Sequence, residues 1–326
     1  MHSCIILFIR MKGKTKLSLL LLVSTIGLAN SLSGCTTKLL SDEPSFLKYS
    51  NEVTKEQWLE KSDIALNESL FFNQSGSAFS STVKQSANTS RRQTEKNDKT
   101  EKELANATMT SSQNGSMKVD TSHRTMEVKN SKKSSSTNKS LGIYLGDDST
   151  KSSKNRTLQV ENYEGKNCIV SVNKDLKVYQ VLEEINDSFS FNDKTKNVLM
   201  NQFVSFFELR NRILTSYIGL DNSVSKFYID DTVYTFTYTR DFTTALDDYI
   251  LKEYRNIVFQ FDFANQHVGQ FSHTYDTTYT YNSDTSTKKV VYNKSTSYFE
   301  GHITLKTQKV KSVNLSSYDR VLEDLE

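Results

Sequence analysis

The residues best equipped for covalent chemistry in this chain of 326 residues are its three cysteines, Cys4, Cys35 and Cys168. A thiol can form a disulfide, attack an electrophile or carry a lipid. Cys35 stands apart from the other two because it ends the tetrapeptide Leu-Ser-Gly-Cys, which directly follows an apolar segment. The chemistry of Cys35 therefore depends on what that segment is.

The segment has the layout of a secretory leader. An apolar run from Leu17 to Leu28 follows a basic patch and precedes small residues, and it is too short for a membrane span. The patch consists of Arg10, Lys12, Lys14 and Lys16. Leu32-Ser33-Gly34-Cys35 resembles the lipobox of bacterial lipoproteins, which implies that the Gly34–Cys35 bond is cut and that Cys35 carries a diacylglyceryl thioether. The alternative is an ordinary signal peptide that happens to contain a cysteine.

Lipidation would tether the protein to a membrane that it does not cross, because two or more acyl chains give stable anchoring. Thr36 after the lipidated cysteine, rather than Asp, is compatible with the periplasmic side of an outer membrane; the alternative location is the outer face of the cell membrane. Cys4 leaves with the leader, so Cys168 has no intrachain partner and the chain is not a disulfide scaffold. Cys168 alternates with Val170 and Val172, which favours a small apolar residue in a strand.

The remaining polar residues show no pattern that indicates catalysis. The mature histidines match no zinc spacing: they are His123, His267, His273 and His302. Asp230-Asp231 and Asp247-Asp248 are adjacent carboxylates, which point apart and cannot share a substrate. The chain has no phosphate-binding glycine loop and no Gly-x-Ser-x-Gly motif. We therefore expect neither an enzyme nor a cofactor nor a metal, and a net charge of +3 is too small to favour nucleic acid.

The N-terminal part of the chain is predicted to contain little fixed structure. Residues 1–34 are the leader, and residues 35–72 hold one weakly helical stretch around Trp58 and Leu66. Residues 73–140 are rich in Ser, Thr, Asn and Lys and poor in aromatic residues, in a chain that is only 36% hydrophobic. Such a segment buries too little surface to offset its conformational entropy, so we predict a long disordered linker.

Residues 141–240 are predicted to form two small strand–helix–strand–strand modules. The first has a strand at 168–172, a helix at 176–185 and a strand at 188–191. The second has a strand at 198–204 and then a helix, begun by a capping box of Ser205 and Glu208, whose stripe is Phe206, Leu209, Ile213 and Tyr217. Gly219 ends this helix, and a hairpin follows around Asp230-Asp231.

The stretch from Cys168 to Arg240 resembles the small modules in the periplasmic part of type IVb pilus secretins, which are outer-membrane lipoproteins. The likeness rests on Val170 to Asn173, on Phe206 to Leu220, and on the strands around Tyr228 and Tyr234. It implies a structural component of a type IV pilus or secretin-type assembly, without the channel domain. The partners implied are envelope or pilus proteins and further copies of this chain.

Residues 241–326 are predicted to be β-rich. A helix is expected over 242–254, a strand over 257–263, a meander over 271–312 and a terminal helix over 316–325. The fold class that follows is α+β: small modules and an antiparallel region after a disordered tether. The meander, with Tyr275, Tyr279 and Tyr281, supports a second hypothesis, a surface lipoprotein that binds a peptide, a glycan or a host surface through a Tyr/Thr-rich sheet.

Overall fold

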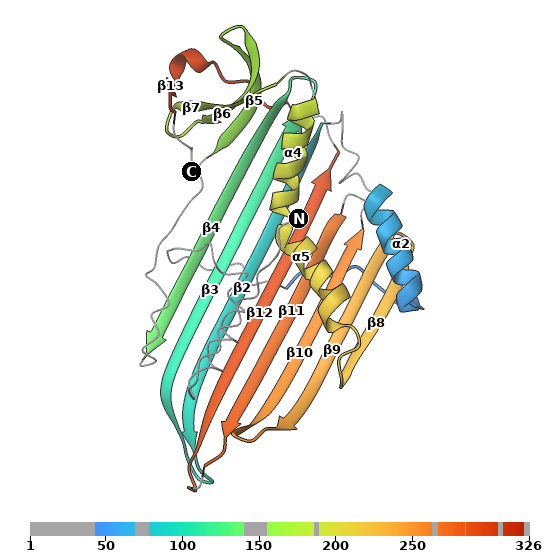
Figure 1. Cartoon of the computed structure of the whole chain (residues 1–326), viewed down its shortest axis with the longest axis vertical. Coiled ribbons are helices and arrows are strands. Elements are labelled where there is room, and N and C mark those ends of the chain that lie inside the picture. The colour runs from blue at the N-terminus through green and yellow to red at the C-terminus, as the bar shows by residue number, and fades with distance from the viewer. Residues whose placement is uncertain are drawn as a thin grey trace.

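A single very wide β-sheet dominates the computed structural model (Figure 1). The structure describes residues 43–68, 78–139, 155–185, 189–262, 267–283, 285–305 and 309–322. The leader and the predicted lipidation site Cys35 lie outside these residues. The thirteen described strands follow one another in the order β1-β8-β9-β10-β11-β12-β2-β3-β4-β5-β6-β7-β13.

Most strands are long and antiparallel, and only β13 pairs in parallel, with β7. Their bounds are β1 Glu52–Val53, β2 Phe79–Lys96, β3 Glu101–Asp120, β4 Thr125–Lys139, β5 Arg156–Tyr163, β6 Lys166–Asn173, β7 Val178–Glu184, β8 Ser223–Asp230, β9 Val233–Ala245, β10 Tyr249–Asp262, β11 His267–Tyr281, β12 Lys288–Thr304 and β13 Asp319–Arg320. The helical elements are α2 Lys55–Glu68, α4 Phe189–Gln202, α5 Val204–Arg212, the π-helical turn η1 Ile213–Tyr217 and the 3-10 turn η2 Leu315–Ser317.

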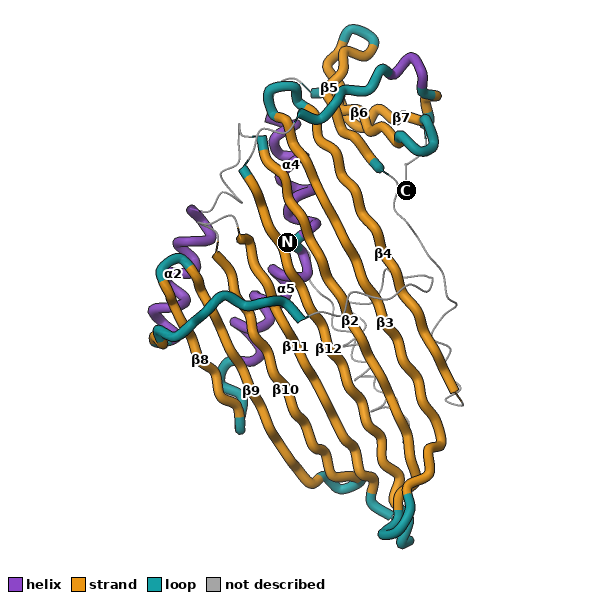
Figure 2. Tube along the Cα trace, turned by 180° about the vertical axis from the view of Figure 1, so that it is seen from behind, coloured by secondary structure: helices purple, strands orange, loops and turns teal. Residues whose placement is uncertain are grey.

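The sheet has two unlike faces, because successive side chains of a strand point to opposite sides. One face, here called the helix face, carries α2, α4 and α5, which cover its upper and middle parts (Figure 1). Its large buried residues form one core: Trp58 from α2, Phe203 and Phe206 beside and within α5, and a band of phenylalanines from β8 to β12. The opposite face, here called the open face, carries none of these three helices (Figure 2).

The contact between α5 and the sheet depends on two glycines. Gly269 and Gly301 are paired across β11 and β12. A Cβ atom on Gly269 would lie 2.2 Å from the ring of Phe206, and one on Gly301 would lie 2.3 Å from the ring of Phe203. The missing side chains let both rings reach the sheet, where Phe206 stacks on Phe259 at a ring-centroid distance of 4.5 Å.

The N-terminal described residues, Glu43 to Asn51, cross the open face; we call them the strap (Figure 2). Two buried glutamines hold it. Gln260 accepts a hydrogen bond from the Leu47 backbone N–H at 2.8 Å and donates one to the Leu47 carbonyl at 2.9 Å. Gln270 donates to the Ser45 carbonyl at 3.1 Å. The strap then joins the sheet edge as β1, and the chain passes to the helix face as α2.

The α+β fold class predicted from the sequence is wrong, and so is its disordered tether. Residues 79–139 form β2, β3 and β4, the middle of the sheet. The segment has few large apolar residues, but apolar residues recur at alternate positions on the helix face, as at Ala105 and Ala107 or at the larger Met117 and Val119. Pairing with β12 along the whole length of β2 satisfies the backbone, so little side-chain burial is needed.

Two strand–helix–strand–strand modules are also not found. Residues 178–184, predicted as helix, form β7, while the described residues 189–191 and 198–204, predicted as strands, fall in or beside α4 and α5. Ser205 and Glu208 make no capping box, because the N-cap of α5 is Phe203 and no side chain caps it. The helix predicted over 242–254 is replaced by the end of β9 and the start of β10. Of the helix predicted over 316–325, the described residues 316–322 contain the end of η2 and the short β13.

Several local predictions are confirmed. Trp58 lies in helix α2, and the stripe of Phe206, Leu209, Ile213 and Tyr217 is buried along α5 and η1. Gly219 follows η1 with a φ of 85°, and Asp231 turns the hairpin between β8 and β9. Of the alternation predicted at 257–263 and 271–312, the described residues up to Thr304 lie mostly in β10, β11 and β12, and residues 309–312 are not strand. Cys168 lies in β6 as a buried free thiol, packed with Val170 and Val172.

Candidate functional site

A group of polar and aromatic residues lies on the helix face, where η1 ends. We call it the Tyr–Arg cluster, and it consists of Tyr217, Tyr238, Arg240, Glu253, Arg255, His273 and Tyr275. The guanidinium of Arg255 lies between two rings, 4.9 Å from the centroid of Tyr217 and 4.1 Å from that of Tyr275. Glu253 accepts a hydrogen bond from Arg240 at 3.2 Å and lies 3.8 Å from Arg255.

Two arginines thus share one carboxylate, and the group keeps a net positive charge. Tyr217 reaches it from the π-helical turn η1, a type of irregularity often found at functional sites. Tyr238 packs against Tyr217 at a centroid distance of 5.4 Å. Burial raises the pKa of Tyr238 and of Tyr275 above the ordinary tyrosine value, so both phenols stay neutral and can donate or accept hydrogen bonds.

His273 belongs to this cluster but has the wrong acidity for acid–base catalysis at neutral pH. Burial lowers its pKa to about 3, and the positive charges of Arg255 and Arg212 act in the same direction. Its Nε2 atom is buried and has no hydrogen-bond partner among the described residues. A general base works best with a pKa near the working pH. The imidazole therefore serves as a neutral packing group against Tyr217 and Tyr275.

A small pocket adjoins the cluster below the start of α5. Its volume is about 40 Å³, enough for a few water molecules or one small substituent of a larger ligand. The lining combines amides, hydroxyls and two aromatic residues: Gln85, Ser86, Ala87, Ser111, Ser112, Gln113, Ser205, Phe271, Ser297 and Tyr298. Gln85 donates a hydrogen bond to Gln113 at 3.0 Å across β2 and β3. The lining contains no charged residue.

The pocket and the cluster are continuous through the register of the sheet. Ser297 of the pocket pairs with His273 of the cluster, and the next row on the same face pairs Ser295 with Tyr275. The neutral hydrogen-bonding groups of the pocket therefore lie next to the aromatic and cationic side chains of the Tyr–Arg cluster. Such a site can hold a polar ligand by hydrogen bonds and ring contacts.

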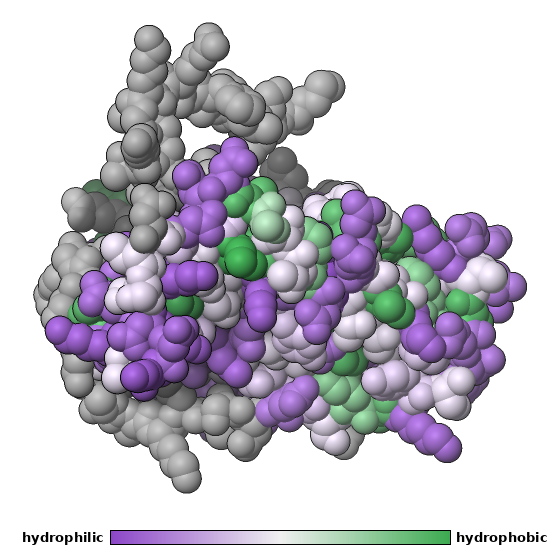
Figure 3. Space-filling model, turned by 90° about the horizontal axis from the view of Figure 1, so that it is seen from below, coloured by the Kyte–Doolittle hydropathy of each residue, from purple (hydrophilic) through white to green (hydrophobic). Residues whose placement is uncertain are grey.

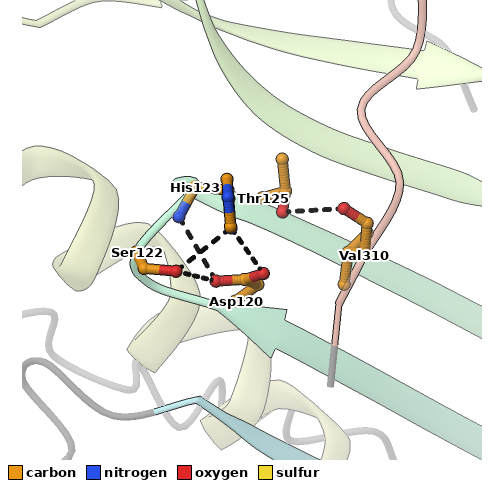
Figure 4. Close-up of polar contacts among 5 residues, drawn as sticks. All are labelled: Asp120, Ser122, His123, Thr125 and Val310. Atoms are coloured by element: carbon orange, nitrogen blue, oxygen red, sulfur yellow. Dashed lines mark hydrogen bonds and ion pairs between the residues drawn. The ribbon is translucent and has the colours of Figure 1, made fainter. Parts of the chain in front are cut away.

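A turn between β3 and β4 brings an aspartate, a serine and a histidine together, as a hydrolase triad would (Figure 4). Asp120 accepts hydrogen bonds from the Ser122 hydroxyl at 2.6 Å and pairs with His123 Nδ1 at 2.8 Å. The Ser122 hydroxyl also lies 3.1 Å from that same Nδ1. A triad needs the serine at the other ring nitrogen, so these contacts stabilise a turn and do not activate a nucleophile. Thr125 donates to the Val310 carbonyl and fixes the C-terminal segment nearby.

The other residues singled out in the sequence are structural where they are described. Asp230 accepts bonds from the Ser50 and Asn51 backbones and so fixes the strap. The carbonyls of Asp247 and Asp248 accept bonds from Asn282 at the β9–β10 turn. The side chain of His302 forms a hydrogen bond with that of Glu300, and His267 of β11 is the strand-pairing partner of His302. Among the described residues, no group of three or more His, Cys, Asp or Glu could hold a metal ion.

The sequence pattern does not indicate the Tyr–Arg cluster, because it predicts a helix over residues 242–254, where the structure has β9 and β10. On a strand, Glu253 and Arg255 continue the alternation of Ile257 and Phe259 and share their face. Extending that alternation backwards places Glu253 and Arg255 on one face, whereas Arg240 joins them only through the pairing of β9 with β10. The predicted tyrosines Tyr275, Tyr279 and Tyr281 do share this face, and Tyr279 packs with Tyr249 in a separate small core.

The described surface carries no large continuous hydrophobic patch in the view from below (Figure 3). Hydrophobic residues appear there as small areas separated by hydrophilic ones. None of the described helices is long and apolar enough to cross a membrane.

Comparisons with known proteins identify no family. No protein-family model matches the chain, and no curated protein sequence matches it. Among solved structures, one titled "Lipid-protein interactions in lipovitellin" is similar over 72% of this chain and 26% of the lipovitellin chain, with 7% identity and a TM-score of 0.28. This chain thus spans about a quarter of the length of that protein. A TM-score of 0.28 is too low to establish a shared fold.

Proposed function

We propose that this protein is a lipid-anchored envelope lipoprotein that binds a glycan on the helix face of its sheet. The observation that carries the binding proposal is the uncharged pocket of amides and hydroxyls beside the Tyr–Arg cluster. Sugar hydroxyls donate and accept hydrogen bonds, as do the side chains of Gln85, Gln113 and Ser297. A small substituent, such as an acetamido or hydroxymethyl group, matches the pocket volume of about 40 Å³.

A peptide is the weaker candidate for the same pocket. Peptides commonly bind sheets by adding a strand to an exposed edge. The pocket lies over β2, β3, β11 and β12, which are interior strands with a neighbour on either side. Their backbone groups are engaged in the sheet, so the ligand must be recognised by side chains. Hydroxyl and amide side chains in a row favour a polyhydroxylated ligand.

The alternative role, as a structural component of a type IV pilus or secretin assembly, loses its basis in the fold. That hypothesis rested on repeated strand–helix–strand–strand units over residues 141–240. The described residues of this range instead supply a small β-unit, a helical pair and the strands β8 and β9 near one edge of the large sheet. The lipid anchor does not depend on that resemblance, since it rests on the leader and on Leu32-Ser33-Gly34-Cys35.

The anchor is tested by replacing the thiol. In Cys35→Ser, labelled palmitate should no longer enter the protein, whereas the wild type should incorporate it and partition into detergent. The mature mass of the wild type should fit cleavage after Gly34 plus acyl chains. Cys168 is buried, so palmitate that persists in Cys35→Ser would contradict the proposed topology.

Glycan binding is tested by filling the pocket. Ala87→Leu should place a larger side chain in the pocket and weaken binding of soluble peptidoglycan fragments or neutral oligosaccharides at least tenfold, measured by titration calorimetry. Asn88→Leu is the matched control, because Asn88 is the next residue of β2 and points to the open face. Equal binding by wild type and Ala87→Leu, with unchanged melting temperatures, would refute this site.

A further inference from the structure

The open face of the sheet is the surface to which the predicted anchor leads. The strap begins at Glu43, which lies near Tyr298 of β12. Burial raises the pKa of the Tyr298 phenol, and the negative charge of Glu43 raises it further. Seven residues separate Cys35 from Glu43. A fully extended chain covers at most about 3.6 Å per residue, so Cys35 lies within about 29 Å of the open face.

A stripe of lysines runs along the open face beside the start of the strap. Four successive rows across β2, β3 and β4 carry one lysine each: Lys118, Lys129, Lys84 and Lys133. Rows on one face are about 6.6 Å apart, so the stripe is about 20 Å long. Lys84, Lys118 and Lys129 are exposed. The fourth row also contains Tyr298, where the strap starts.

One carboxylate within the stripe, Glu127, does not cancel this charge. Burial alone would raise the pKa of Glu127, but the hydrogen bond from Lys174 and the charges of Lys174, Lys129 and Lys118 outweigh it and lower the pKa. Glu127 is therefore ionised at neutral pH and faces three cations. The β2–β4 part of the open face keeps an excess of positive charge.

The other half of the open face exposes apolar side chains. Leu47 on the strap, Val224 on β8 and Tyr254 on β10 are large hydrophobic residues with exposed fractions of 39%, 57% and 43%. Tyrosine and basic side chains are the types that favour the boundary between headgroups and acyl chains. The two halves together suit an anionic bilayer surface.

We propose that the open face lies against the anionic membrane that carries the anchor, so that the helix face with its pocket points away from the bilayer. This inference rests on the proposed lipid anchor at Cys35. It does not depend on which ligand binds the pocket. A membrane surface accounts for the short connection, the lysine stripe and the exposed Leu47, Val224 and Tyr254 together.

The test compares two probe positions in the lipidated, mature protein. Asn114 lies within the lysine stripe, and Glu208 lies exposed on α5 on the opposite side of the molecule. Asn114→Cys and Glu208→Cys are each labelled with a fluorophore and reconstituted in vesicles of three parts phosphatidylcholine to one part phosphatidylglycerol, with a headgroup quencher. The only native thiol of the described chain, Cys168, is buried and does not compete for the label.

Quenching should be several-fold stronger at residue 114 than at residue 208, and high salt should reduce the difference. The difference in quenching should also be smaller in a triple variant that carries Lys84→Gln, Lys118→Gln and Lys129→Gln. The difference should be unchanged in a control variant that carries three substitutions in the helices, Lys55→Gln, Lys61→Gln and Lys194→Gln.

Equal quenching at both positions in protein that floats with the vesicles would overturn the orientation, and would assign the open face to another partner. Stronger quenching at residue 208 would reverse it. A chain that does not float with the vesicles would overturn the anchor itself, and palmitate labelling would show that failure independently. A difference that survives high salt and loss of the lysines would overturn the role of the lysine stripe.

Discussion

The two halves of the sheet reach the same regular structure by different means. Strands β9 to β12 bury phenylalanines and tyrosines beneath the helices, among them Phe236, Phe259 and Phe299. Strands β2 to β4 are as long but bury mostly small residues, such as Val83 and Ala107. Their open face is built from hydroxyl pairs such as Thr110 and Ser135, whose oxygens lie 2.8 Å apart. The first half is stabilised by side-chain burial and the second mainly by strand pairing.

The largest expected effect belongs to the aromatic half. Phe206 is fully buried and stacks on Phe259 and Phe299, with ring-centroid distances of 4.5 Å and 5.4 Å. Phe206→Ala should lower the free energy of unfolding by about 3–5 kcal/mol, because it removes these contacts and leaves a cavity. Urea denaturation measures the change. Tyr254→Ala, on the exposed open face, should change it by no more than about 0.5 kcal/mol.

The next effect concerns the strap, which the aromatic half holds. Gln260→Leu removes both bonds to Leu47 and the bond to Thr235, and leaves buried groups unsatisfied. We expect a loss of about 1–3 kcal/mol. Hydrogen exchange should show faster exchange at the Leu47 amide than in wild type. The same exchange rate in Gln260→Leu would mean that the strap is held by other contacts.

A smaller, pH-dependent effect is expected in the polar half. The hydrogen bond from Ser122 lowers the pKa of Asp120 below its ordinary value, and contacts with His123 lower it further. Burial acts in the opposite direction but is outweighed. The bonds of the ionised carboxylate therefore stabilise the fold above the unfolded pKa of about 3.9 and are lost as the pH falls through the lower folded pKa.

Asp120→Asn should be less stable than wild type by about 1 kcal/mol at pH 7. The difference should shrink as the pH falls below about 4, because protonation removes the same charge from the wild type. Thermal melts between pH 3 and pH 7 measure it. A constant difference across this range would contradict the role of the ionised carboxylate.

The smallest effect tests whether hydroxyl pairs matter to the polar half at all. Thr110→Val keeps the β-branched shape but removes the bond to Ser135 on the next strand. A cross-strand pair of this kind contributes about 0.2–1 kcal/mol, so the loss should lie at the lower end of that range. Chemical denaturation of Thr110→Val and Ser135→Ala, alone and together, would measure the coupling. A loss as large as that of Phe206→Ala would remove the contrast between the two halves.

The contrast also explains what the sequence could predict. Strict alternation of large residues, as from Ile257 to Phe261, correctly predicts strands, because each large side chain needs a buried face. Alternation of small residues, as at Ala105 and Ala107, is hidden among serines and threonines. The pairing of β2 with β12 joins residues such as Thr89 and Ser295, 206 positions apart, and no local pattern contains that information.

The candidate site was only partly predictable for the same reason. The tyrosines of β11 were visible as an alternating series, and the structure places them on one face. Arg240 and Arg255 were not singled out, because they come close only when β9 and β10 pair. The pocket joins β2 and β3 to β11 and β12, and so it exists only in the complete sheet.

The position of β2 in the sheet also determines when the sheet can form. Because β2 pairs with β12, the N-terminal hairpin has no partner on that side until almost the whole chain has been synthesised. Contacts so distant in sequence form slowly. An unpaired strand with exposed apolar residues would be prone to aggregate, whereas serine, threonine and lysine side chains disfavour aggregation of an unpaired edge. The polar composition of β2, β3 and β4 therefore protects the chain during the interval between synthesis of its first long strand and its last.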